Sequence, residues 1–500
     1  MKNKLSYITI VFVFLSQMAF AQAYKPLRVE YSSRTFDQLR IIPAGPDRVI
    51  SFLHHSKRSS RGDLWQVNGL DASFNTVWSQ DILIPRAYVL SEYEIERDSI
   101  LHLLISREGG DNASFLKLRL NIINGKYSVY FFKGNRRALL VGLKLLNDRI
   151  YLYGLGLENI QSQLDEYNAG THNEKIVTAK VPGQYYILAA MADSVHNRFI
   201  IIAKNKKSDS GELHLLEFDT DGNLTQDNIL GQMQAQNLVT GNLVYSDKKE
   251  IFFIGTFNYN TGKKRRAEEE VAVGEFIGKI KDNKFEFFRF YRFAEFTNIL
   301  KTLSFREQQK VRMEKGKGKS VDLYLNILMH KTILNQDGLF ILVGESYYPV
   351  YHYETMYDGR GYMYQTEVFD GYQTTSAMAA AFDDKGNLVW DNYIQVNGVQ
   401  TYYLEENVTV YNDNEDGTQV FTYYLNEHIY SKVTKGNETI FKKEATALPT
   451  VASGEQVLAE DNGKITHWHS SFFLISGYQK VYGLDNKSRK VFFITAVAFR

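Results

Sequence analysis

The sequence predicts an all-β protein, and three observations support this prediction. Tyrosine and phenylalanine number 33 and 32, and with valine and isoleucine they fall in short runs typical of strands. Turns of Asp, Asn, Gly and Lys separate these runs, as hairpin turns do. Only seven prolines are present, and no Pro/Ser/Gly-rich linker divides the chain. We therefore expect one large β domain rather than several small ones.

The hairpin turns recur at a regular interval. The phrase "FDDKGNLVWDNYI" at 382–394 has an echo, "FDTDGNLTQDNIL", at 218–230. Similar turns are centred on Asn75, Asn124, Asn173, Gly222, Asn283, Gly386, Gly436 and Asn486. Five of the seven steps between these centres are 49 or 50 residues, and the others are 61 and 103. A period near 50 indicates a repeat architecture.

Each repeat predicts a meander of four antiparallel strands, A to D. A polar turn and an apolar strand B, such as "DRIYLYG" at 148–154, precede most of the turns, and another extended stretch precedes strand B. Four-stranded units of this length, repeated radially, form a β-propeller. We count eight blades, with residues 27–31 as an extra strand near 490–497. Seven blades are the alternative, because residues 158–170 form an irregular third strand in unit three.

One turn resembles a known repeat. Ala381, Asp383, Gly386 and Trp390 supply the four residue types of the turn in quinoprotein-like propeller repeats, with one residue fewer between Asp and Gly. The copy at 218–230 has Gln226 in place of the tryptophan. The resemblance implies the architecture alone. In sialidase-type Asp boxes the tryptophan follows the Asp one residue sooner than Trp390 follows Asp384, so we do not carry over their activity.

The N-terminus predicts export. Residues 1–21 contain Lys2 and Lys4, an apolar run and an Ala-Phe-Ala end, which is the pattern of a signal peptide. The mature chain, 22–500, would be a single propeller domain, periplasmic or secreted, without a transmembrane segment. It has no cysteine, so disulfides and thiolate metal sites are excluded. Loss of two lysines from 58 basic residues leaves 56 against 57 acidic ones, which argues against nucleic acid as a partner.

Long insertions predict which face of the propeller works. The A–B and C–D turns share one edge and are short, whereas insertions at 258–272, 294–321 and 346–376 fall on the other edge of two neighbouring blades. They predict one raised patch, since functional residues concentrate on loops. The first insertion has the basic run Lys263–Arg266 close to the acidic run Glu268–Glu270. It would either pair with a charged partner or neutralise itself as a solvated loop. The second predicts a helix over 297–314, which would bind a partner or cap the rim.

The third insertion predicts a tyrosine-rich hairpin. Tyr351, Tyr353 and Tyr357 share one face of its first strand, and Tyr362 and Tyr364 share one face of its second. Tyrosine offers a rigid ring with a polar tip, which suits protein and sugar ligands. These five are the candidate ligand-binding residues. The alternative is that they pack on the neighbouring insertion.

No catalytic or cofactor motif appears in the sequence, so catalytic residues stay unassigned and no metal or cofactor is expected. His54, His55, His467 and His469 would come near one another on closure of the ring, but strand B lies away from the axis and no carboxylate completes a metal site. We expect an exported propeller that presents its long-loop face to a protein or glycan. The alternative is a carbohydrate-active enzyme with carboxylates near the central opening, which requires two or three acids within about 5 to 10 Å.

Overall fold

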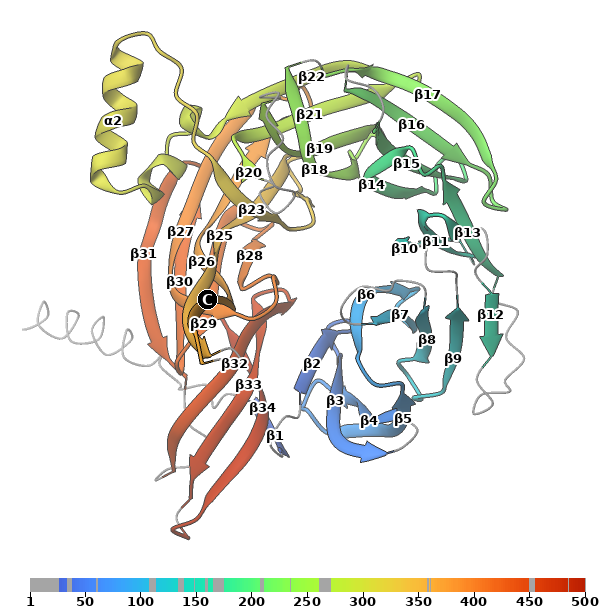
Figure 1. Cartoon of the computed structure of the whole chain (residues 1–500), viewed down its shortest axis with the longest axis vertical. Helices are drawn as coiled ribbons and strands as arrows, with labels where there is room; N and C mark the ends of the chain where they lie inside the picture. Colours follow the sequence, from blue (N-terminus) through green and yellow to red (C-terminus); the bar gives the residue numbers. More distant parts are fainter. Residues whose placement is uncertain are drawn as a thin grey trace, which may run out of the picture.

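The computed structural model describes residues 27–33, 38–59, 62–107, 114–133, 139–147, 149–157, 161–164, 175–206, 211–233, 235–259, 271–357, 359, 361–448, 455–483 and 485–499. Its strands form eight sheets arranged in a ring (Figure 1). The predicted all-β propeller with eight blades is therefore confirmed. The expected signal peptide, residues 1–21, lies outside the described residues, as does most of the insertion at 258–272.

Blades 1 to 4 follow one another along the first half of the chain. Blade 1 contains β2 (Gln38–Pro43), β3 (Arg48–Ser59), β4 (Gly62–Asp71) and β5 (Thr76–Ile84). Blade 2 contains β6 (Tyr88–Glu96), β7 (Ile100–Arg107), β8 (Ser114–Asn121) and β9 (Tyr127–Lys133). Blade 3 contains β10 (Leu139–Leu146), β11 (Arg149–Leu155) and β13 (Lys175–Val181). Blade 4 contains β14 (Tyr185–Asp193), β15 (Arg198–Asn205), β16 (Glu212–Phe218) and β17 (Leu224–Gln232).

Blades 5 to 8 complete the ring. Blade 5 contains β18 (Gln236–Tyr245), β19 (Ile251–Tyr259), β21 (Gly274–Lys281) and β22 (Lys284–Arg292). Blade 6 contains β20 (Val271–Ala272), β23 (Leu325–Met329), β24 (Ile333–Leu334), β25 (Phe340–Tyr357), β26 (Met363–Phe382) and β27 (Leu388–Thr401). Blade 7 contains β28 (Val408–Asn412), β29 (Thr418–Leu425), β30 (His428–Lys435) and β31 (Glu438–Ala447). Blade 8 contains β32 (Gln456–His469), β33 (Phe472–Tyr482), β34 (Ser488–Ala498) and β1 (Leu27–Ser32).

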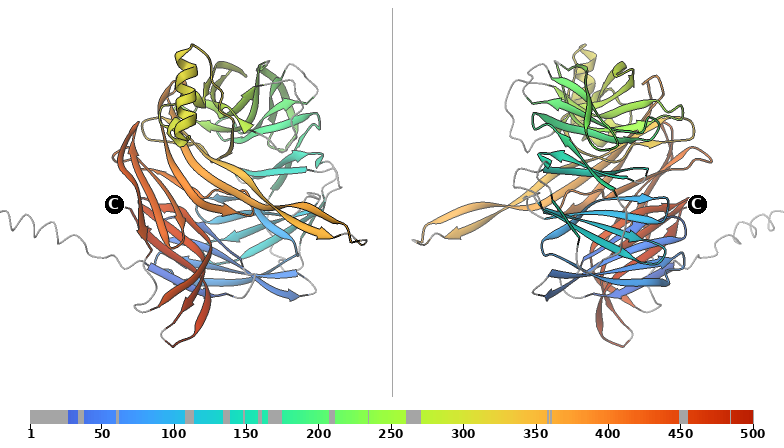
Figure 2. Two further views of the ribbon diagram at one scale, coloured as in Figure 1. Left: turned by 60° about the vertical axis from the view of Figure 1, so that its left-hand side comes forward. Right: turned by 90° about the vertical axis from the view of Figure 1, so that its right-hand side faces the viewer.

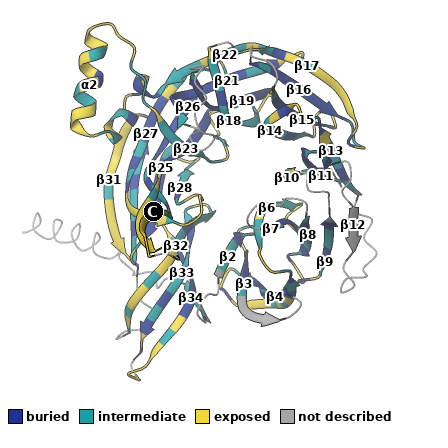
Figure 3. Cartoon of the chain, in the orientation of Figure 1, coloured by how far each residue is buried: buried dark blue, intermediate teal, exposed yellow. Residues whose placement is uncertain are grey.

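The core lies between the blades. Eight clusters of buried apolar side chains each join two consecutive blades, and the series returns from blade 8 to blade 1. At the last interface, Val49 and Phe74 of blade 1 pack with Trp468 and Ile494 of blade 8. Inner strands such as β15 and β19 are mostly buried, whereas the outermost strands β17 and β31 are largely exposed (Figure 3). Burial of apolar surface between blades therefore holds the ring together.

The two ends of the chain close the ring in one sheet. Strand β1 pairs antiparallel with β34, with Leu27 opposite Ala496 and Ser32 opposite Val491. The predicted pairing of 27–31 with 490–497 is confirmed. In blade 8 the fourth strand thus comes from the N-terminus, which protects the edge of β34. The repeat pattern predicts 462–469 as the second strand of this unit and 485–488 as the turn between its third and fourth strands. This prediction is wrong: 462–469 lies in the innermost strand, and the turn at 485–488 joins the second and third strands.

Blade 3 departs from the common pattern. Its third described strand, β13, pairs parallel with β11, whereas β12 (Gln161–Leu164) pairs with β9 of blade 2. Among the described residues, which omit 158–160 and 165–174, the sheet of blade 3 has the three strands β10, β11 and β13. The chain therefore has eight sheets, with a degenerate third blade.

The recurring phrase forms the same hairpin turn in three blades. The Asp383 carboxylate accepts N–H bonds from Lys385 and Asn387 at 2.9 and 2.7 Å, and it accepts the Asn387 amide at 2.8 Å. Asp71 and Asp219 bind their own turns in the same way. Gly386 has φ +76°, where a glycine is least strained. Each turn is thus capped by an acid and opened by one residue of positive φ.

The insertion at 294–321 forms η3 (Phe293–Glu295), η4 (Ile299–Thr302) and α2 (Phe305–Gly316). The helix begins later than predicted because Ser304 caps it, with Glu307 bonded back to the Ser304 N–H at 2.9 Å. Asp391 holds the preceding turn by accepting the N–H groups of residues 297–299 at 2.6 to 2.9 Å. Across the described residues, no helix is long and apolar enough to span a membrane.

Candidate functional site

The tyrosine hairpin forms an arm that projects from the ring. Strand β23 pairs with β25 up to Tyr347, and β27 pairs with β26 down to Tyr372. Beyond these points, among the described residues, only β25 and β26 pair with each other. We call residues 349–371 the arm. The right-hand view of Figure 2 shows that it extends well beyond the ring. A two-stranded ribbon of this kind is marginally stable by itself, so it depends on its base and on what it binds.

The register of the arm separates the five candidate tyrosines. Tyr351 lies opposite Phe369, Tyr353 opposite Glu367 and Tyr357 opposite Met363, so these side chains share one face, which we call the aromatic face. Tyr364 lies opposite Met356 and belongs to the reverse face. The expected face on β25 is present, but Tyr364 does not join it. Tyr362 directly precedes β26, which begins at Met363.

The aromatic face is exposed. Tyr353, Tyr357 and Met363 are 67%, 70% and 68% exposed, and Tyr351 is 47% exposed. The alternative that these tyrosines pack on the neighbouring insertion is not what the structure shows for its described residues. Tyr362 and Tyr364 are exposed as well. Large apolar side chains gathered on one exposed surface are typical of interaction sites.

The aromatic face continues into the ring at the base of the arm. The Phe369 ring lies 5.4 Å from Tyr351, 5.1 Å from Tyr372 and 5.8 Å from Tyr402. Tyr402 and its neighbour Tyr403 are also exposed. This loop, residues 402–407, was not predicted as part of the site, although its Tyr-Tyr pair directly follows the last strand of the same blade. The arm and the loop together form one continuous aromatic surface.

A buried carboxylate fixes this loop to the arm's strand. Glu345 of β25 is buried, and its Oε1 accepts the N–H groups of Asn407 and Val408, both at 2.8 Å. His330 Nε2 lies 2.9 Å from the same oxygen. Burial lowers the pKa of His330, but Glu345 and Glu406 outweigh it and the pKa is raised above its ordinary value. The base of the arm is therefore rigidly attached to the ring.

The reverse face of the arm carries a small charged group. His352 Nδ1 lies 2.6 Å from Asp370, and its Nε2 lies 3.2 Å from Glu354. Glu354 and Asp370 raise the pKa of His352 above its ordinary value. All three side chains are at the surface, so this group adds charge to the arm rather than stability.

Two acids of the innermost strand of blade 2 are paired with a lysine of blade 3. Glu92 and Glu94 of the innermost strand β6 both approach Lys144 of β10, at 3.1 and 3.0 Å. Burial lowers the pKa of Lys144, but the two carboxylates raise it above its ordinary value. Glu92 also accepts the Leu143 N–H at 2.8 Å. These contacts join blades 2 and 3, so this acid pair is structural and the enzyme alternative gains no support from it.

Two more acids lie on the loop at the base of the arm. Glu405 pairs with Lys464 of blade 8 at 2.6 Å. Glu406 is exposed, and its charge acts on both His330 of blade 6 and Tyr93 of blade 2. Burial, followed by Glu406, raises the pKa of Tyr93. The charge of Glu406 therefore reaches both blade 2 and blade 6, and Glu94 acts on Tyr93 as well.

The histidines of the sequence analysis serve other purposes. His54 lies 3.3 Å from Asp63, and His467 stacks on Tyr411 with 4.5 Å between ring centroids. His469 packs on Phe472. The side chain of His55 lies outside the described residues. No group of three or more His, Asp or Glu side chains with metal-binding geometry occurs among the residues that the structure describes.

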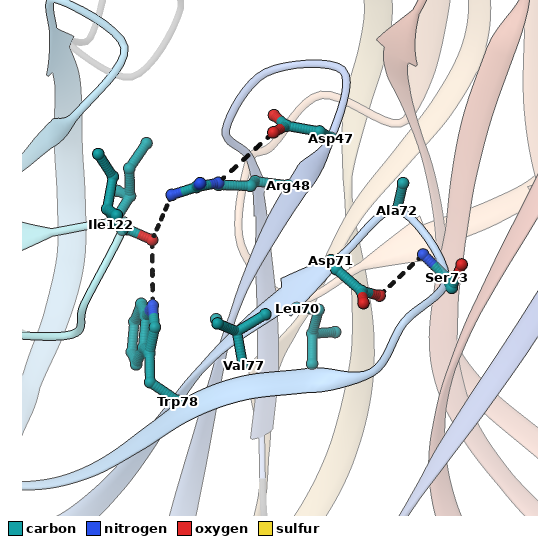
Figure 4. Close-up of a pocket in the computed structure, with 11 residues that line it drawn as sticks. Asp47, Arg48, Leu70, Asp71, Ala72, Ser73, Val77, Trp78 and Ile122 are labelled. Carbon is teal, nitrogen blue, oxygen red and sulfur yellow. Dashed lines mark hydrogen bonds and ion pairs between the residues drawn. The ribbon is translucent and has the colours of Figure 1, made fainter.

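A shallow hollow lies on the opposite edge, where the short turns are (Figure 4). It measures about 270 Å³ and is lined by Trp78, Arg48, Asp71 and Ile122, among others, of blades 1 and 2. Trp78 Nε1 donates to the Ile122 carbonyl at 3.0 Å, and Arg48 Nη1 donates to the same oxygen at 3.3 Å. Trp78 and Arg48 therefore join blades 1 and 2 at this hollow.

The two insertions that the structure describes do not form one raised patch. Helix α2 lies at the outer rim of the ring, whereas the tip of the arm lies away from it in both views of Figure 2. The expectation of a shared patch is therefore wrong for these two insertions. They are separate surfaces of one molecule.

No protein-family model matches the sequence, and no curated protein matches it. Among solved structures, the chain is similar to the eukaryotic initiation factor, with 10% identity, 93% of this chain and 92% of that chain covered, and a TM-score of 0.35. It is similar to the WD40 domain of Toxoplasma gondii coronin, with 8% identity, 95% of this chain and 87% of that chain covered, and a TM-score of 0.31. It is also similar to the hemagglutinin-neuraminidase ectodomain of parainfluenza virus 5, with 6% identity, 99% of this chain and 95% of that chain covered, and a TM-score of 0.24. These TM-scores are too low to support any conclusion about function, and the fold rests on the eight sheets themselves.

Proposed function

We propose that this chain is an exported β-propeller that binds another protein through the aromatic face of its arm, with the ring as a rigid scaffold. The observation that carries the proposal is the exposure of Tyr353, Tyr357 and Met363, each about two-thirds in water on a ribbon that projects from the ring. Aromatic residues and methionine are enriched in protein interfaces. The cost of holding this face in water is recovered when a partner covers it.

The shape of the arm favours a protein over a glycan. Small ligands and sugars bind in concave sites that bury most of their surface. The arm is a projecting ribbon, which a partner's groove can enclose from both sides. Its free strand edges add backbone groups that can pair with a partner strand. Continuity with Tyr402 and Tyr403 enlarges the surface toward the central opening.

Export belongs to the proposal and has its own test. The charged start, apolar run and Ala-Phe-Ala end of residues 1–21 support it. N-terminal sequencing of the mature protein should begin at Gln22 or within a residue or two of it. A membrane-bound form that keeps Met1 would contradict export.

The binding role is tested by comparing the two faces of the arm. A triple variant, Tyr351→Ala/Tyr353→Ala/Tyr357→Ala, removes the aromatic face, and Tyr364→Ala on the reverse face is the matched control. Exported proteins of the producing cell are captured on each immobilised protein and the same proteins are tested on a glycan array. We expect a protein captured by wild type and by Tyr364→Ala, with affinity for the triple variant reduced by about 1 to 4 kcal/mol per lost anchor. Equal capture by wild type and by both variants would refute the role of the arm. Binding to glycans alone would show that the ligand is a sugar rather than a protein.

A further inference from the structure

Helix α2 carries a basic surface that its own surroundings leave largely unmatched. From 305 to 319 the chain has six basic residues (Arg306, Lys310, Arg312, Lys315, Lys317 and Lys319) and two glutamates, a net charge of +4. Lys317 and Lys319 pair with Glu314 at 3.0 and 3.3 Å. Among the residues that the structure describes, Arg306, Lys310 and Arg312 make no ion pair. These three charges point to a partner that is acidic.

Apolar side chains accompany these charges. Phe305 and Met313 are 75% and 58% exposed, and Val311 is the one buried residue of α2. Arg306, Lys310 and Met313 are spaced by four and three residues, so they share one side of the helix. Phe305 and Arg312 are seven residues, or about two turns, apart, so they lie together on the adjacent side of the helix. A methionine and a phenylalanine among arginines are suited to contact aromatic rings.

The arm has the complementary chemistry. Its described residues include Glu354, Glu367 and Asp370 and no lysine or arginine, a net charge of −3 with His352 neutral. Asp358 and Arg360 of its turn cancel in this sum. Glu367 lies opposite Tyr353 on the aromatic face, whereas Glu354 and Asp370 lie with His352 on the reverse face. The arm is thus both aromatic and acidic, as α2 is both apolar and basic.

Geometry decides how these two surfaces can meet. The arm and α2 lie apart on one molecule (Figure 2), so a single chain cannot join them. Two arms would repel each other, since each carries the same negative charge. We propose that the arm of one copy docks on helix α2 of a second copy, so that the chain assembles head to tail. This proposal rests on the proposed function of the arm and names its partner as a second copy of this chain.

A head-to-tail contact has a distinctive consequence. Each copy offers one arm and one helix, so the contact repeats and builds an open filament, or a ring if the rotation closes. The contact is small and charged, so its affinity should depend on protein concentration and on salt. We expect association to weaken at least about tenfold between roughly 0.05 and 0.5 M NaCl.

The test uses two variants of the mature full-length chain, each blocked on one surface. The first is the arm variant Tyr351→Ala/Tyr353→Ala/Tyr357→Ala, and the second is the helix variant Arg306→Glu/Lys310→Glu/Arg312→Glu. Sedimentation velocity and light scattering should show assemblies for wild type and monomers for either variant alone. The mixture should form one-to-one dimers and nothing larger, because one variant keeps an intact helix and the other an intact arm. Addition of Glu354→Lys/Glu367→Lys to the helix variant should restore assembly.

The outcomes separate this inference from the proposed function. Wild type that stays monomeric at high concentration overturns the self-assembly, and so does a mixture in which no dimer forms. If the arm still binds another protein in those cases, the proposed function survives without the second copy. Assembly that persists in the arm variant overturns both roles of the aromatic face. Circular dichroism of each variant establishes that loss of assembly is not loss of folding.

Discussion

Tyr364 lies opposite Met356 on the reverse face of the arm, and its hydroxyl donates to the methionine sulfur at 3.8 Å, whereas Tyr353 lies on the aromatic face. The two tyrosines are equally part of one short ribbon and differ in the surface that they offer. This pair of faces makes it possible to separate recognition from stability.

Alanine at Tyr353 and Tyr357 together should hardly change the melting temperature. Both rings are mostly in water, and surface changes of this kind cost within about 0.5 kcal/mol each. The matched core variant is Tyr151→Ala, whose ring is fully buried and stacked on Phe199 at 5.0 Å. Its loss should cost about 3 to 5 kcal/mol. Thermal unfolding followed by circular dichroism compares the two variants. An arm variant as unstable as the core variant would show that the hairpin has a structural role rather than a role in recognition.

The pair of His330 and Glu345 should make stability depend on pH. The pKa of His330 is raised above its ordinary 6.5, so the folded state favours the protonated ring. The stabilisation is complete below pH 6.5 and falls as pH rises through the raised pKa. The melting temperature should therefore fall between pH 6 and pH 9. In His330→Gln, which keeps a donor for Glu345 but does not titrate, this part of the fall should be absent. An equal pH dependence in both proteins would contradict the assignment.

The blade repeat was readable from the sequence because each outer corner needs the same local chemistry. Asp71, Asp219 and Asp383 each cap a turn whose fourth residue has positive φ. In blades 4 and 6 that residue is glycine, which is easily recognised. In blade 1 it is Phe74, with φ 60°, so the similarity of this turn to those of blades 4 and 6 was harder to recognise from the sequence. Trp78 follows Asp71 by seven residues as Trp390 follows Asp383, a second match that the sequence analysis overlooked.

The faces of the arm were less readable, for a physical reason. Alternation along one strand places Tyr351, Tyr353 and Tyr357 together whatever the partner does. The face of Tyr364 depends on the register, which the number of turn residues sets, and a slip of one residue moves every side chain across. Two irregularities, at Ser346/Tyr347 and Val350/Tyr351, also shift the pairing. The loop at 402–407 joins the site only through the fold, which places Tyr402 beside Phe369.

Asp391 should be among the most sensitive acids of the ring. It is buried and accepts three backbone N–H groups from the turn before α2. Asp391→Ala would leave these donors without partners at a cost of about 1 to 3 kcal/mol for each group that stays buried. Asp384→Ala is the control, because its ion pair with Lys248 is exposed and should contribute about 0 to 1 kcal/mol. Urea unfolding measures both, and equal midpoints would show that the turn finds other partners.

Closure of the ring by β1 gives the last prediction. Strand β1 covers the edge of β34 and packs Leu27, Val29 and Tyr31 into the cluster between blades 8 and 1. Its ion pairs add a second tie, because Arg489 binds Glu30 at 3.1 Å and Glu455 at 2.6 Å. Val29→Asp places a charge against that cluster without shortening the chain, and Val77→Asp on the exposed side of β5 is the control. Because each blade is stabilised by both of its neighbours, the ring should unfold in one transition, and Val29→Asp should move that transition to lower temperature by several degrees. Removal of the last ten residues should have a larger effect, since it deletes the buried Phe492, Phe493 and Ile494. A separate early transition in calorimetry, with the main one unmoved, would show that blade 8 unfolds independently and that the ring does not depend on its closure.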